Sequence, residues 1–91
     1  MPLTELEEAL RPIARERIAK GQLPRKEPSR MLGGPGSGQI CSLCDKPIER
    51  YQIEYEIEQR GASAQTFRFH TACQSIWQLE CAGDDYLRKR P

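Results

Sequence analysis

The chain has 91 residues, of which 37% are hydrophobic and 30% are charged. A domain this small buries too little surface to be stable on its core alone, so a metal, disulfides or a partner must supplement the core. The formal net charge of +1 excludes a chain that is basic throughout, of the kind that binds nucleic acid or a membrane surface by charge alone.

The N-terminal segment does not have the features of a targeting signal. It lacks a basic start and a continuous apolar run, and no apolar stretch of the sequence is long enough to cross a bilayer. We therefore expect a cytoplasmic protein without membrane contact, in which cysteines are free or bind metal rather than form disulfides.

The first predicted element is an amphipathic helix in residues 1–21. Thr4 and Glu7 have the spacing of a capping box, and Gly21 stands where a helix commonly ends. Pro12 removes one backbone donor and disfavours helical geometry at the preceding residue, so we expect a kink or a break there. The apolar face is narrow, and the sequence leaves open whether it packs on a partner protein or on the rest of this chain.

Cations are concentrated between residues 11 and 30, where only two acidic residues oppose them. A local group of cations can neutralise phosphates, so this stretch is a candidate nucleic-acid contact. The candidate residues are Arg11, Arg15, Arg17, Lys20, Arg25 and Lys26.

Residues 22–39 are predicted to be a linker. They contain Pro24, Pro28 and a glycine-rich run, a composition typical of a mobile or irregular segment. A phosphate-binding P-loop would require a lysine and a serine or threonine after the last glycine, but Gln39 and Ile40 follow.

The next predicted elements form a β-hairpin. Apolar and polar residues alternate strictly over residues 51–58, as in a half-buried strand, and again on a returning strand after a turn at residues 61–63. The apolar positions are Tyr51, Ile53, Tyr55 and Ile57 on the first strand and Phe67 and Phe69 on the second.

The last predicted element is a helix over residues 71–82. A capping box at Thr71 marks its start and Gly83 its end. Its apolar face, which includes Trp77, is expected to pack on the hairpin. The charged residues 84–91 are expected to form a flexible tail.

Two residue pairs have the spacing of metal ligands. Cys41 and Cys44 form a C-x-x-C pair in a turn, and His70 and Cys73 stand three residues apart at the start of the last helix. Three thiolates and an imidazole give a closed tetrahedral ligand set, which proteins use for structural zinc. We therefore predict one structural Zn²⁺ ion held by these four residues.

Two alternatives remain open for these residues: the cysteines only pack in the core, or the two pairs form a disulfide. Cys81 is not expected to be a ligand, because eight residues of helix separate it from Cys73 by about 12 Å along the helix axis. We expect Cys81 to be buried as a small apolar residue, with a spare thiol as the alternative.

The order of these parts resembles the treble-clef zinc finger, in which a C-x-x-C knuckle and a β-hairpin precede a helix whose first turn supplies the second ligand pair. Residues 41–48 and 69–73 are also similar to the first zinc module of LIM domains, with Asp45 where many knuckles have glycine. The whole chain resembles small bacterial proteins. The resemblance implies a zinc-stabilised α+β fold over residues 40–83, preceded by the amphipathic helix, and it implies no particular activity.

For the function, we expect a structural zinc-binding module that mediates a protein–protein interaction as a monomer. The alternative is a regulatory nucleic-acid-binding zinc finger that uses the basic residues between 11 and 30, and a third hypothesis is a thiol redox or metal sensor. An enzyme is not expected, because a closed site leaves no open metal position and no catalytic pattern surrounds the single histidine.

Overall fold

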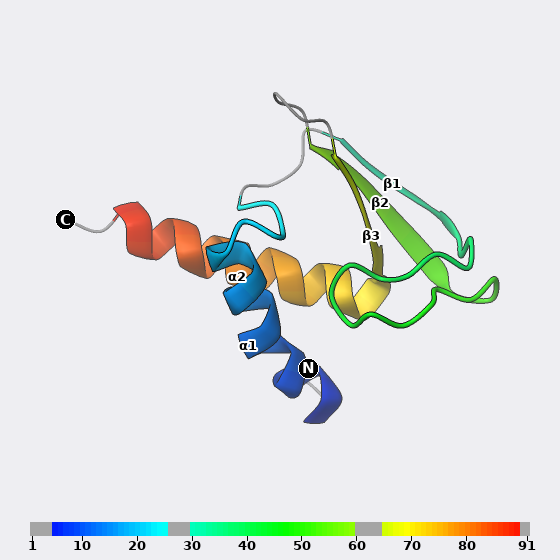
Figure 1. Cartoon of the computed structure of the whole chain (residues 1–91), viewed down its shortest axis with the longest axis horizontal. Coiled ribbons are helices and arrows are strands. Elements are labelled where there is room, and N and C mark those ends of the chain that lie inside the picture. The colour runs from blue at the N-terminus through cyan, green and yellow to red at the C-terminus, as the bar shows by residue number, and fades with distance from the viewer. Residues whose placement is uncertain (1–4, 26–29, 60–64, 90–91) are drawn as a thin grey trace.

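The structure is a computed structural model that describes residues 5–25, 30–59 and 65–89 (Figure 1). Over these residues it is a small α+β fold with two helices and one three-stranded antiparallel sheet in the strand order β1-β2-β3. Neither helix, over the residues described, combines the length and the apolar composition that a membrane crossing requires. In chain order the elements are α1 (Glu5–Ala19), β1 (Arg30–Pro35), β2 (Ile53–Gln59), β3 (Gln65–His70) and α2 (Thr71–Lys89).

Helix α1 is one helix that continues across Pro12 and does not break there. The proline lies on the exposed side of the helix, as does Glu8, whose carbonyl loses its usual donor at Pro12. Water can satisfy a carbonyl on that side, so the missing hydrogen bond does not end the helix.

The predicted end of α1 at Gly21 is confirmed. Gly21 has a φ of 76°, its N–H donates to the carbonyl of Ile18, and the N–H of Gln22 donates to the carbonyl of Arg17 at 2.8 Å. This pair of bonds is the Schellman arrangement, which satisfies the last carbonyls of a helix and favours glycine in the left-handed position. The chain then turns back, and Leu23 becomes buried.

The segment predicted as a linker, residues 22–39, contains strand β1, which corrects that prediction. β1 pairs antiparallel with β2 from Arg30 opposite Glu58 to Pro35 opposite Ile53. Its glycines and its proline have low strand propensity, but ladder hydrogen bonds join backbone groups and do not depend on the side chain. Partner pairing, rather than local sequence, therefore produces this edge strand.

The predicted hairpin is confirmed as β2 and β3, which pair antiparallel with Tyr55 opposite Phe69 and Ile57 opposite Phe67. The turn expected at residues 61–63 lies outside the described residues. On the polar face, Arg68 forms ion pairs with Glu54 and Glu56 on the neighbouring strand, at 3.7 and 3.4 Å.

Helix α2 begins at Thr71, as predicted, but it extends to Lys89 and includes residues expected to form a tail. Gly83 does not act as a stop, because it does not have the positive φ of Gly21. A glycine inside a helix costs about 1 kcal/mol relative to alanine, which lowers the stability of the helix without ending it.

Helix α2 is the central element of the fold, since it contacts α1 on one side and β2 and β3 on another (Figure 1). Trp77 and Phe69, both fully buried, stack with ring centroids 5.4 Å apart and join α2 to the sheet. The Nε1–H of Trp77 and the Sγ–H of Cys81 both donate to the carbonyl of Pro24, which fastens the chain after α1 to the same helix.

Helix α1 packs on this chain through both apolar and charged contacts. Leu10, Ala14 and Ile18, spaced by four residues, are buried in the core. Glu80 of α2, only 7% exposed, accepts hydrogen bonds from Arg11 and Arg15. Of the two arrangements that the sequence left open, the structure therefore shows the helix folded back on its own chain.

Candidate metal centre

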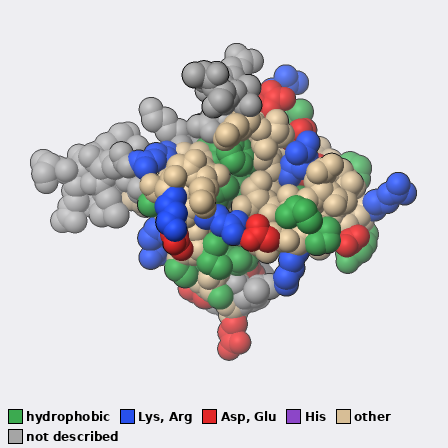
Figure 2. All heavy atoms as spheres, viewed as in Figure 1, with side chains coloured by type: hydrophobic (Ala, Val, Ile, Leu, Met, Phe, Trp, Pro, Cys, Tyr) green, Lys and Arg blue, Asp and Glu red, His purple; other side chains and the backbone are tan. Residues whose placement is uncertain are grey.

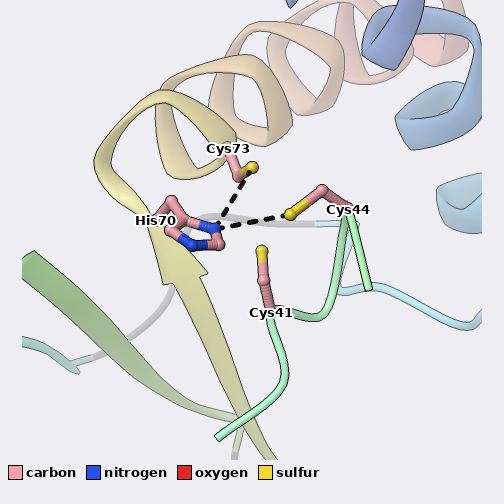
Figure 3. A group of neighbouring side chains, drawn as sticks. All are labelled: Cys41, Cys44, His70 and Cys73. Carbon is pink, nitrogen blue, oxygen red and sulfur yellow. Dashed lines mark hydrogen bonds between the residues drawn. The ribbon is translucent and has the colours of Figure 1, made fainter. Parts of the chain in front are cut away.

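Cys41, Cys44, His70 and Cys73 converge on one point, as the spacing predicted (Figure 3). The four ligand atoms, three Sγ and one imidazole nitrogen, all lie within 4.8 Å of one another. We call this group the four-ligand cluster. None of the four cysteines, all of which lie in the described residues, forms a disulfide, so the disulfide alternative is not realised.

The first ligand pair is carried by a tight turn, the knuckle (residues 40–47), whose ends pair as an isolated bridge between Ile40 and Pro47. Inside it, Asp45 has a φ of 63° and its N–H donates to the carbonyl of Cys41 at 3.1 Å. Aspartate tolerates the left-handed region better than most residues, which explains how it replaces the glycine of many knuckles. The N–H of Leu43 also donates to the Sγ of Cys41 at 3.5 Å.

The knuckle is attached to β3 by a reciprocal pair of hydrogen bonds. The N–H of Ser42 donates to the carbonyl of Arg68 at 2.7 Å, and the N–H of Arg68 donates to the Oγ of Ser42 at 3.1 Å. Because β3 leads directly into His70, these bonds set the distance between the two ligand pairs.

The second ligand pair spans the junction of β3 and α2. His70 ends the strand, and Cys73 lies in the first turn of the helix. The Nδ1 of His70 faces the sulfurs, at 3.4 Å from the Sγ of Cys44, while its Nε2 lies 3.2 Å from the carbonyl of Pro47. A carbonyl only accepts, so Nε2 carries the proton and Nδ1 offers its lone pair to the centre of the cluster.

The two distances between the imidazole nitrogen and the sulfurs of Cys44 and Cys73 fit a tetrahedral ion. With Zn–S bonds near 2.3 Å and Zn–N bonds near 2.0–2.1 Å, the edge between a sulfur and a nitrogen ligand is about 3.6 Å. The measured distances from His70 Nδ1 are 3.4 Å to the Sγ of Cys44 and 3.9 Å to the Sγ of Cys73, on either side of that value. Three thiols and an imidazole are also the soft donor set that zinc prefers.

The three thiols compete for protons at this distance. A hydrogen bond from Cys73 lowers the pKa of Cys41 to about 4, and the same shared proton raises the pKa of Cys73 far above its usual value. Burial raises the pKa of Cys44. Ionising all three thiols in one buried place requires a cation among them, which is the role of the metal in sites of this type.

Arg17 of α1 lies outside the cluster and forms hydrogen bonds to the knuckle, a contact that was not predicted from the sequence. Its Nη1 donates to the carbonyls of Ser42 and Leu43, at 2.7 and 2.9 Å, and its Nη2 donates to the Oδ2 of Asp45 at 2.7 Å. The bond to Arg17 lowers the pKa of Asp45, and the bond to Asp45 raises the pKa of Arg17. No local pattern signals this contact, because its partners are about 25 residues away in sequence.

The basic residues proposed as nucleic-acid contacts are largely engaged within the chain. Lys26 lies outside the described residues. On the face shown in Figure 2, Lys and Arg side chains are interspersed with Asp and Glu side chains. Besides the contacts of Arg11, Arg15 and Arg17 given above, Lys20 pairs with Glu16 at 2.7 Å and Arg25 donates to the carbonyl of Ala19 at 3.0 Å.

Cys81 is 4% exposed and stands outside the four-ligand cluster, as the helix geometry predicted. Its contact with the carbonyl of Pro24 is part of the packing between α2 and the segment after α1.

A hollow of about 620 Å³ opens beside the cluster. Ligand residues Cys44, His70 and Cys73 form part of its wall, and Leu10 and Ile53 give it an apolar lining. Ile53, at the start of the central strand β2, is 52% exposed.

Comparison of the chain with models of protein families, with curated proteins and with solved structures finds no match.

Proposed function

We propose that the four-ligand cluster holds one structural Zn²⁺ ion and that the ion organises the fold of residues 40–83. The observation that carries the proposal is the convergence of three thiols and an imidazole nitrogen within 4.8 Å, with the imidazole oriented by the carbonyl of Pro47. In a chain of this size the free energy of metal binding is also free energy of folding.

The proposed architecture is that of a treble clef. The knuckle supplies Cys41 and Cys44, the hairpin follows, and the first turn of α2 supplies the last ligand, which is the order of parts in that class. The additional strand β1 and helix α1 extend this unit on two sides.

We propose a structural rather than a catalytic role. Four protein ligands complete a tetrahedral zinc sphere, whereas a catalytic zinc ion keeps one position for water or substrate. His70, the single histidine of the chain, belongs to this ligand set, and its Nε2 is hydrogen-bonded to the backbone carbonyl of Pro47.

The cellular role that we propose is protein–protein interaction by a monomeric, cytoplasmic protein of bacterial type. The apolar hollow beside the cluster and the exposed side chains of Tyr51 and Ile53 support it, since exposed apolar groups in one region favour a protein contact. The test is photo-crosslinking in the native host from position 53, with Leu79 on α2 as the control position. One discrete protein adduct from position 53 alone supports the role, and equal labelling from both positions contradicts it.

Nucleic-acid binding through the basic stretch is the weaker proposal. The ion pairs of Arg11, Arg15 and Arg17 with acidic residues of the same chain reduce the charge that phosphates would meet. A redox sensor that uses Cys81 is weaker still, because that thiol is buried and its S–H is directed to a carbonyl.

The ligand assignment is tested by native mass spectrometry of three forms of the full chain. The unmodified chain is expected to carry one zinc ion. Cys81→Ser is expected to keep that ion, because Cys81 is not in the cluster, whereas Cys73→Ser is expected to lose it or to bind it at least tenfold more weakly. Zinc loss in Cys81→Ser with retention in Cys73→Ser would refute the assignment.

A further inference from the structure

Arg17 connects α1 to the knuckle, and its contacts are made to the backbone between the two knuckle ligands. The carbonyls of Ser42 and Leu43 lie within 2.9 Å of its Nη1. Both residues stand between Cys41 and Cys44, so a shift of either carbonyl would move a ligand. The side chain of Arg17 is 25% exposed and is therefore partly shielded from water.

The carboxylate of Asp45 also accepts hydrogen bonds from this guanidinium, from Nη1 at 3.3 Å and from Nη2 at 2.7 Å. Asp45 follows Cys44 directly and carries the left-handed φ that closes the turn. Two-point binding of a carboxylate by arginine fixes direction as well as distance. Arg17 therefore constrains the turn at three residues: through the carbonyls of Ser42 and Leu43, and through the side chain of Asp45, which has the positive φ.

The charge of Arg17 also suits a loaded site. Three thiolates, a neutral imidazole and a divalent ion leave one net negative charge on the cluster. A guanidinium close to the knuckle offsets that charge, and hydrogen bonds and cations around the ligands are the means by which proteins tune a bound metal.

Helix α1 links the same two parts of the molecule that the metal links. A bound ion would join the knuckle to the first turn of α2, and α1 joins them from outside, through Arg17 on the knuckle and through Glu80 on α2. When two connections join the same two parts of a molecule, forming either one restricts the relative motion of those parts. The other connection then costs less conformational entropy, so each connection favours the other.

We infer that Arg17 is a positioning residue of the metal site, and that it couples the docking of α1 to the retention of the metal. The inference rests on the proposed function, since it assigns to α1 a part in holding the ion. The N-terminal helix is accordingly a component of the metal-binding unit.

The test compares Arg17→Gln with Lys20→Gln in the full chain. Both variants remove one positive charge near the C-terminal end of α1, but the ion pair of Lys20 is made with Glu16 of that helix. Zinc affinity is measured by competition with a chromophoric chelator. Arg17→Gln is expected to bind zinc about 10-fold or more weakly than the unmodified chain, in the range seen for residues that support metal ligands, and Lys20→Gln is expected to change affinity much less.

A second readout separates positioning from general loss of stability. With Co²⁺ in place of zinc, the thiolate-to-metal charge-transfer band reports on the environment of the cysteine ligands. Arg17→Gln is expected to shift this band, whereas Lys20→Gln leaves it in place. Equal affinities of the two variants, or an unshifted band in Arg17→Gln, would overturn the inference while the proposed zinc site stands. Failure of the unmodified chain to bind zinc or Co²⁺ would instead refute the proposed function.

Discussion

Replacement of Glu80 by glutamine tests whether α1 is held on α2 as the structure shows. The carboxylate accepts from the Nε and Nη2 of Arg11, at 3.3 and 3.2 Å, and from the Nε of Arg15 at 2.8 Å. Glutamine has nearly the same shape, but it carries no charge and turns one acceptor oxygen into a donor that faces an arginine. The substitution therefore removes the ionic contact and leaves the packing of α2 in place.

The size of the effect follows from the burial of the three side chains. A hydrogen bond to a charged group contributes about 1.5–3 kcal/mol when it is shielded from water. Glu80 is 7% exposed, but Arg11 and Arg15 are 37% and 65% exposed, so water screens both ion pairs. We expect Glu80→Gln to lower the free energy of unfolding by about 1–2 kcal/mol.

The assay is urea unfolding of the full chain at saturating zinc, with Glu16→Gln as the matched control. Glu16 also pairs with a cation of α1, Lys20, but both side chains are about 60% exposed. The control is expected to unfold like the unmodified chain. If Glu80→Gln unfolds at the same urea concentration as the control, α1 is not docked through Glu80 and the reasoning fails.

Two further substitutions test the backbone around the site and the core beneath it. A Cβ atom at Gly36 would clash with the carbonyl oxygen of Glu49, so Gly36→Ala is expected to displace the loop before the knuckle. NMR is expected to show large changes in the amide chemical shifts of that loop. An unchanged spectrum would contradict this prediction. Trp77→Phe removes the indole donor to the carbonyl of Pro24, which still accepts from the S–H of Cys81. The loss of packing is expected to lower the free energy of unfolding, measured by thermal unfolding, by about 1–3 kcal/mol. An unchanged free energy of unfolding would refute the stack of Trp77 on Phe69.

The four-ligand cluster was predictable because ligand chemistry is carried by a few residue types at fixed spacing. Cys41 with Cys44, and His70 with Cys73, are short-range pairs, and a tight turn and a helix start each bring their pair to one side. The exclusion of Cys81 needed only the rise of a helix. Local geometry was sufficient for each of these steps.

Strand β1 and the length of α2 were not predictable in the same way. The glycines of β1 indicate a loop by propensity, and the strand forms because β2 offers backbone partners from Arg30 to Pro35. Gly83 indicates a helix end, but nothing in its neighbourhood requires the left-handed φ that would make it one. For β1, pairing with β2 therefore decided against the local preference.

The docking of α1 and the hydrogen bonds of Arg17 to the knuckle were even less predictable from the sequence than β1 and the length of α2. A narrow apolar face fits a partner as well as its own chain, and the sequence does not distinguish them. Arg17 belongs to a basic stretch that predicts phosphate contact, whereas its partners in the structure are two backbone carbonyls and Asp45. Every residue has a backbone carbonyl, so the sequence does not show which carbonyls accept a hydrogen bond from a side chain.

The central claim is that one bound metal ion organises this fold, and metal content measured together with a folding signal tests it most directly. Purified full chain is analysed for zinc per chain, and its NMR spectrum is recorded before and after removal of the metal by a chelator. We expect one zinc ion per chain, and loss of the dispersed signals of β2, β3 and α2 when the ion is removed. A metal-free sample with the same dispersed spectrum would contradict the account.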